Sequence, residues 1–138
     1  MADTVTVKQL SDTRRHCVYE FTNRSDGTGE SAVKKVDIAD LIGTSGATTG
    51  DDRPTSLSII RADYETSFSS VTLLWDRQPT DEVALVMEGE GSVDFTEIGG
   101  KHDPKRGQDG TGNILLTTVG TTSGMAYSIR VKFKKKYS

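Results

Sequence analysis

Two copies of the tetrapeptide Asp-Gly-Thr-Gly are the first feature of this chain that could do chemistry. They occupy Asp26–Gly29 and Asp109–Gly112. Aspartic proteases carry a pair of Asp-Thr-Gly loops whose two carboxylates share one proton. Here a glycine separates the Asp from the Thr, and polar residues precede each copy where an apolar strand would be needed. Sequences of this composition are typical of turns, so we interpret both copies as turns.

A metal site would need several His, Cys, Asp or Glu side chains converging on one point. The candidates are His16, Cys17 and His102, with the acidic pairs Asp51-Asp52 and Asp81-Glu82. Neighbouring residues of a strand point to opposite faces, so His16 and Cys17 cannot share an ion. No EF-hand pattern is present, although a surface calcium site stays open as an alternative. We therefore expect no metal and no cofactor.

Nucleophilic catalysis and phosphate binding have no clear motif either. The chain has no Gly-x-Ser-x-Gly sequence, and Cys17 fits a small buried strand residue. Neither Gly-rich loop is followed by a helix whose N-terminus could hold a phosphate. We expect that this protein is not an enzyme.

Basic residues gather toward the end of the chain, at 101–106 and at 130–136. A single-stranded nucleic-acid groove would add exposed aromatic side chains for stacking. Tyr127 and Phe133 fall on the apolar side of the predicted last strand. We interpret the basic residues as a solvated strand edge that discourages aggregation, with contact to an acidic protein surface as the second alternative. We expect no nucleic-acid partner.

Composition indicates a sandwich of short strands. The chain has 138 residues, of which 33% are apolar and 14 are Gly, with one Cys and a net charge of −3. Residues 1–100 carry 9 Lys and Arg against 18 Asp and Glu, whereas residues 101–138 carry 8 against 2. The two signs either interleave in space or form a bipolar subunit. No run is long enough to span a membrane, and the start Met1-Ala-Asp-Thr is unlike a signal peptide, so we expect synthesis in a cytoplasm and no membrane partner.

Alternation of apolar and polar residues predicts the strands. The central stretch is Ser69–Ile98, which holds the only Trp. In it we expect Val71, Leu73 and Trp75 on one buried face, followed by Val83, Leu85 and Met87, then Val93 and Phe95. Further strands are predicted at 4–10, 15–22, 56–64, 113–119 and 125–133. Residues 31–38 fit a strand or a short helix.

These elements predict one all-β domain over residues 1–138, an antiparallel two-sheet β-sandwich of eight or nine short strands. Its connections would be jelly-roll-like or Greek key. Residues 1–6 are expected to form an N-terminal arm, and residues 43–54 and 99–112 to form long Gly-rich loops.

Several segments resemble small structural proteins of tailed bacteriophages. They are residues 21–37, Leu73–Asp76, Phe95–Gly100, Gly110–Val119 and a last strand with the pattern Tyr-x-Ile-x-Val that ends in Lys. The resemblance is closest to capsid decoration, or cement, proteins. It implies a virion component, made in the host cytoplasm, that binds the major capsid protein on the outer surface of the shell. A phage tail or head-completion protein and a carbohydrate-binding β-sandwich are the alternatives.

The resemblance also implies self-association, for which a trimer is our guess because shell proteins often meet at three-fold positions. We expect the arm and the two long loops to make the contacts with partners. The candidate partner-binding residues are Thr4, Thr6, Thr44, Asp51, Asp52, Arg53, Lys101, His102, Lys105 and Arg106.

Overall fold

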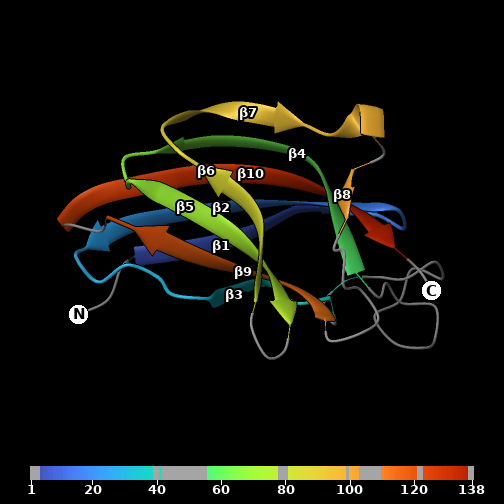
Figure 1. Ribbon diagram of the computed structural model, residues 1–138, viewed down its shortest axis with the longest axis horizontal. Helices are drawn as coiled ribbons and strands as arrows, with labels where there is room; N and C mark the ends of the chain where they lie inside the picture. The colour runs from blue at the N-terminus through green and yellow to red at the C-terminus, as the bar shows by residue number, and fades with distance from the viewer. Residues whose placement is uncertain are drawn as a thin grey trace.

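The computed structural model is an antiparallel β-sandwich (Figure 1). It describes residues 4–38, 41, 56–77, 81–98, 100–102, 110–120 and 123–136. The strands are β1 (Thr4–Asp12), β2 (His16–Asp26), β3 (Val33–Val36), β4 (Ser56–Thr66), β5 (Ser70–Arg77), β6 (Glu82–Met87), β7 (Glu90–Asp94), β8 (Lys101–His102), β9 (Gly110–Val119) and β10 (Ser123–Lys136). Thr96–Ile98 forms one 3₁₀ turn, and the described residues contain no α-helix.

The strands form two sheets of unequal size. The six-stranded sheet has the order β1-β2-β10-β4-β7, and β8 pairs with the free part of β4. The four-stranded sheet has the order β3-β9-β5-β6. In Figure 1 the four-stranded sheet lies in front of the six-stranded one. The prediction of an all-β protein with two antiparallel sheets is confirmed.

The core lies between the sheets, and alternation predicted most of it. Cys17, Tyr19 and Phe21 of β2 point inward. So do the apolar side chains of β10, which are Tyr127, Ile129, Val131 and Phe133. They meet Val71, Leu73 and Trp75 of β5, of which Trp75 is 2% exposed. Side chains of a strand point alternately to its two faces, so the two apolar stripes close on one another and exclude water.

Three predicted elements differ in detail. Residues 31–38, left open between strand and helix, contain the short strand β3. The strand expected to reach Ile98 ends at Asp94, where the Asp94 side chain accepts hydrogen bonds from Thr96 N and Oγ1 and so favours a turn. Of the loop expected at 99–112, Lys101–His102 pair with β4 as β8 and Gly110–Gly112 begin β9.

The prediction that Val83, Leu85 and Met87 share a face is wrong for Val83. Leu85 lies opposite Leu73, but Val83 lies opposite Leu74, because the register shifts at Ala84. An extra residue in one strand turns the side chains beyond it to the other face. Val83 is therefore on the outer face, and its side chain is 54% exposed.

A buried carboxylate joins the two sheets. Glu30, in the connection from β2 to β3, pairs with the Nζ of Lys35, and the two side chains are 4% and 1% exposed. Its Oε1 accepts hydrogen bonds from Asn23 Nδ2 of β2, at 2.7 Å, and from the Tyr127 hydroxyl of β10. Its backbone exchanges hydrogen bonds with Thr118 of β9. Partners from both sheets thus fix one charged side chain.

We predict that Glu30→Gln destabilises the protein strongly, because it leaves the Lys35 ammonium buried without its counter-charge. Removing one member of a buried ion pair costs about 3–5 kcal/mol. The measurement is the free energy of unfolding in urea, followed by Trp75 fluorescence.

The matched control is Asp37→Asn, which breaks the exposed pair between Lys34 and Asp37 and should cost at most about 1 kcal/mol. Adding Lys35→Met to Glu30→Gln should recover part of the loss. Equal losses in Glu30→Gln and Asp37→Asn would contradict this account.

Candidate interaction surfaces

The expected partner-binding residues do not form one site among the described residues. Thr4 and Thr6, which we expected in an arm, lie within β1 opposite Arg24 and Thr22 of β2. Lys101 and His102 lie in β8, opposite Ile59 and Ser58 of β4. The Lys101 Nζ lies 6.0 Å from the centroid of the Phe95 ring, a cation–π contact.

The two groups lie in different rows of the six-stranded sheet. Thr4 belongs to the row of Ala126, and Lys101 to the row of Phe133. Ala126 and Phe133 are seven positions apart in β10, so the two rows lie about 23 Å apart along the strand. The other candidates, which are Thr44, Asp51, Asp52, Arg53, Lys105 and Arg106, lie outside the described residues.

The outer face of the six-stranded sheet is charged, and on it the two signs interleave. Arg61 of β4 contacts Asp63 at 3.1 Å and Asp94 of β7 at 3.6 Å. Arg130 of β10 contacts Glu20 of β2 at 3.0 Å. These side chains are roughly one-third to three-fifths exposed, so each pair contributes little stability. The Arg130–Glu20 pair joins the basic last part of the chain to its acidic first part on this face.

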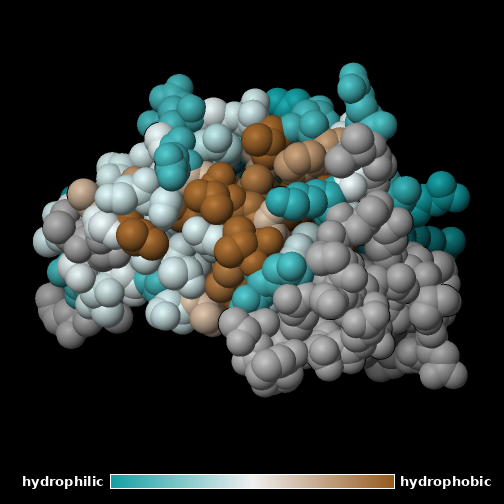
Figure 2. Space-filling model, in the orientation of Figure 1, coloured by the Kyte–Doolittle hydropathy of each residue, from teal (hydrophilic) through white to brown (hydrophobic). Residues whose placement is uncertain are grey.

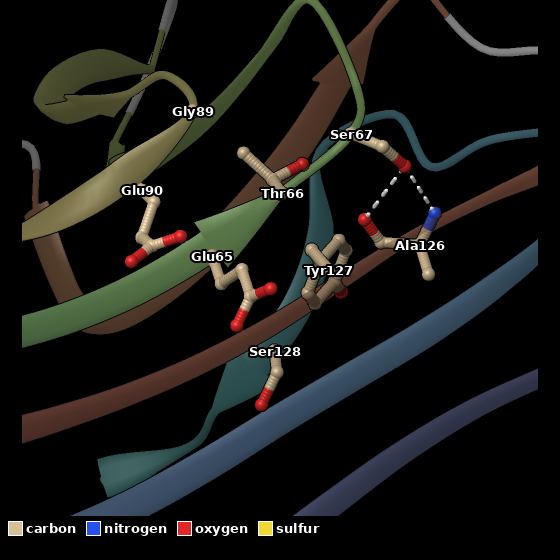
Figure 3. Close-up of a pocket in the computed structure, with 8 residues that line it drawn as sticks. All are labelled: Glu65, Thr66, Ser67, Gly89, Glu90, Ala126, Tyr127 and Ser128. Atoms are coloured by element: carbon tan, nitrogen blue, oxygen red, sulfur yellow. Dashed lines mark hydrogen bonds between the residues drawn. The ribbon is translucent and has the colours of Figure 1, made fainter.

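A shallow acidic hollow of about 510 Å³ opens at the end of this face (Figure 3). Glu65 of β4 and Glu90 of β7 lie directly opposite each other beside it. On its other side Ala126 N donates a hydrogen bond to Ser67 Oγ, at 2.9 Å. Among the residues that the structure describes, no group of three or more His, Cys, Asp or Glu is placed to hold a metal ion.

The outer face of the four-stranded sheet is apolar at its centre. The register places Val83, Leu74 and Leu115 in one row across β6, β5 and β9. Val86 lies opposite Thr72 in the next row. Leu115 is only 7% exposed, so we call Leu74, Val83 and Val86 the valine patch. Figure 2 shows a contiguous apolar area at the centre of this face. Val83 and Val86 are 54% and 50% exposed, although the core behind them is closed.

The valine patch is not evident as a surface from the sequence. The available signal was the run Leu73-Leu74-Trp75, in which both faces of a strand are apolar. Periodicity alone does not distinguish a second buried face from an exposed one, because both give a continuous apolar run. The outward turn of Val83 depends on the irregularity at Ala84, which the sequence pattern does not indicate.

Two titratable side chains on β2 have perturbed pKa values. The pKa of the Cys17 thiol is raised to about 12, chiefly by burial; the Lys135 ammonium opposes this shift and the Asp12 carboxylate adds to it. Lys135 is buried on the inner face and pairs with Asp12 at the end of β1. On the outer face, partial burial lowers the pKa of His16, and the charges of Lys132, Lys134 and Arg15 lower it further.

With this geometry in view, comparison with known proteins gives no relative: no family model matches the chain and no curated protein matches it. Among the described residues, no helix has the length and apolar character needed to cross a membrane.

We predict that Cys17 is unreactive in the folded protein, because the thiolate is the reactive form and a pKa of about 12 suppresses it. At pH 8 iodoacetamide should label the native protein on the order of a thousandfold more slowly than the urea-unfolded protein. Mass spectrometry over time measures both rates. Labelling of the native protein at the unfolded rate would contradict the burial of this thiol.

We predict that His16 makes the protein less stable in mild acid. Its folded pKa lies below the ordinary value of 6.5, so the unfolded chain takes up its proton first as the pH falls. The stability linked to neutral His16 is present above pH 6.5 and is lost as the pH falls through the folded pKa. Urea unfolding at pH 7.5 and pH 5 should show a larger loss for the natural chain than for His16→Gln. An identical loss in both proteins would refute the assignment.

Proposed function

We propose that this chain is a non-enzymatic virion structural protein that binds the outside of a tailed-phage capsid and stabilises it, as a decoration protein. The resemblance of segments 21–37 and Gly110–Val119 to such proteins supports the proposal. The observation that carries it is the valine patch, an apolar area on the outer face of a sandwich whose core is already closed.

The outer faces of the two sheets differ in polarity. On the six-stranded sheet charged side chains cover the outer face, as water requires. On the four-stranded sheet Val83, Val86 and Leu74 occupy the corresponding positions. Contiguous exposed apolar patches mark surfaces that bind proteins. Completing the burial of each half-exposed valine is worth on the order of 1 kcal/mol.

The shape of the patch favours a broad protein partner over a small molecule. The valine patch lies on a sheet surface, and the hollow that we describe lies on the other sheet and is acidic. A sugar-binding module would offer exposed aromatic rings, but Trp75 is 2% exposed and faces the core. The carbohydrate-binding alternative is therefore less well supported than a capsid partner.

The finer points of the proposal rest on the resemblance and on the strand order. We propose jelly-roll-like or Greek-key connections, with the major capsid protein as partner and the capsid surface as location. Placement of β10 between β2 and β4 fits such non-sequential connections. The Gly-rich loop at 43–54 and the part of 99–112 that lies between β8 and β9 are proposed as further contacts with the shell or with sister subunits. A tail or head-completion protein would use the same surface, so the choice between them depends on which particle binds.

The test is co-sedimentation of the purified protein with capsid shells that lack it, from the phage that encodes the chain. We expect saturation at a fixed ratio to the major capsid protein. The double substitution Val83→Lys with Val86→Lys should weaken binding at least about tenfold, because each ammonium would have to be desolvated against the partner.

The matched control is Ser92→Lys with Ser128→Lys, which adds two ammonium groups at exposed positions of the other sheet. It should bind shells like the natural protein. Absence of the protein from the pellet would contradict the decoration role, and binding to isolated tails instead would establish the tail alternative. Equal binding by the two double variants would remove the valine patch from the interface.

A further inference from the structure

β1 forms an edge of the six-stranded sheet that differs from the other strand edges of the sandwich. Among the described residues, β1 pairs with β2 alone. From Thr4 to Gln9 it pairs with β2 residue by residue, before the register shifts between Gln9 and Ser11. We call residues Thr4–Gln9 the β1 edge. An edge strand leaves a row of backbone N–H and C=O groups unpaired on its outer side, which can bind another strand.

Among the described residues, the edges at β3, β7 and β6 carry features that discourage pairing. β3 has four residues and two lysines. β7 has five residues and begins and ends with acids. β6 is interrupted by the irregularity at Ala84. Short length, charge and bulges are the usual protections of strand edges. The β1 edge has six regular residues, no proline and one charged side chain, Lys8.

The β1 edge also extends beyond the cover of the smaller sheet. Val5 and Val7 lie opposite Asn23 and Phe21, on the side that faces the core. Asn23 and Phe21 are 2% and 0% exposed, whereas Val5 and Val7 are 37% and 46% exposed. β1, the outermost strand of this sheet, therefore points Val5 and Val7 toward the core side, where the smaller sheet covers them only partly. A strand added to this edge would bring new side chains against both valines.

We propose that the β1 edge pairs with the β1 edge of a second copy of this chain, antiparallel and about a two-fold axis at Thr6, so that the two larger sheets join into one. In this register Val5 of each copy lies directly opposite Val7 of the other. Directly opposed side chains on one face of an antiparallel pair lie about 4.5–5.5 Å apart, so the four valines cover one another.

Repulsion between the Lys8 side chains of the two copies favours the same register. With the axis at Thr6, Lys8 lies opposite Thr4 of the other copy, and the two Lys8 side chains stay well apart. An axis at Lys8 would place two ammonium groups directly opposite each other, which destabilises a sheet. An unrelated strand would need its own apolar pair at the matching spacing, whereas a second copy supplies it by symmetry. The inference gives a two-fold pair in place of the trimer guessed from the resemblance, and it does not depend on capsid binding.

The first experiment is sedimentation equilibrium of the purified chain at tens of micromolar. We expect a dimer of the 15.0 kDa chain. Val5→Lys with Val7→Lys should give a monomer, because each interface would then carry charge where it needs apolar side chains. Val83→Lys with Val86→Lys, on the outer face of the other sheet, should remain dimeric. A natural chain that is monomeric or trimeric, or a dimer that survives Val5→Lys with Val7→Lys, overturns the proposal.

A second measurement decides the case in which the β1 variant does not fold, as judged by circular dichroism. Thr6→Cys places one thiol from each copy at the axis, and Cys17 is too deeply buried to compete. Mild oxidation should convert most of Thr6→Cys to a disulfide-linked dimer, while Thr4→Cys, which lies opposite Lys8, should stay largely uncrosslinked. Equal cross-linking of the two cysteine variants overturns the register, and no cross-linking of Thr6→Cys overturns the pairing.

Discussion

The buried carboxylate of Glu30 is the interaction on which the closure of the sandwich depends. An isolated charge in the core would be too costly to keep, so every group around it must be in place at once. Asn23 and Tyr127 come from the larger sheet, while Lys35 and Thr118 come from the smaller one. The connection from β2 to β3 passes between the sheets at this network, which joins side chains of both sheets.

Closure leaves the two outer faces with different chemistry. Arg61, Asp63 and Arg130 on the larger sheet form exposed ion pairs, which keep that face hydrated. The valine patch on the smaller sheet is apolar, and in the isolated chain it contributes little to the core. Burial of this area against a protein partner would be favourable. The difference between the faces supports the proposed protein contact, which needs no pocket.

Unequal sheet widths create the second unusual feature. The smaller sheet covers Phe21 and Asn23 fully but leaves Val5 and Val7 of β1 partly open. These two valines point to the core side of the larger sheet, but at its edge they are partly exposed to solvent. Pairing of two β1 edges would satisfy both the backbone groups and the valines, and it would leave the valine patch free on the other sheet. The two proposed contacts can therefore operate together on one particle.

The sequence by itself determined the fold class and most of the core. Alternation in 15–22 and 125–133 identified Phe21 and Phe133 as buried, because a period of two fixes which face a side chain occupies once a strand forms. Tertiary structure decided the rest. Periodicity does not mark Glu30 and Lys35 as a buried pair, and only the meeting of two sheets buries them together. Val83 read as a core residue, and the irregularity at Ala84 turned it outward. Whether a side chain is buried depends on which elements pack against it in the tertiary structure. Local periodicity carries no information about which strand lies opposite.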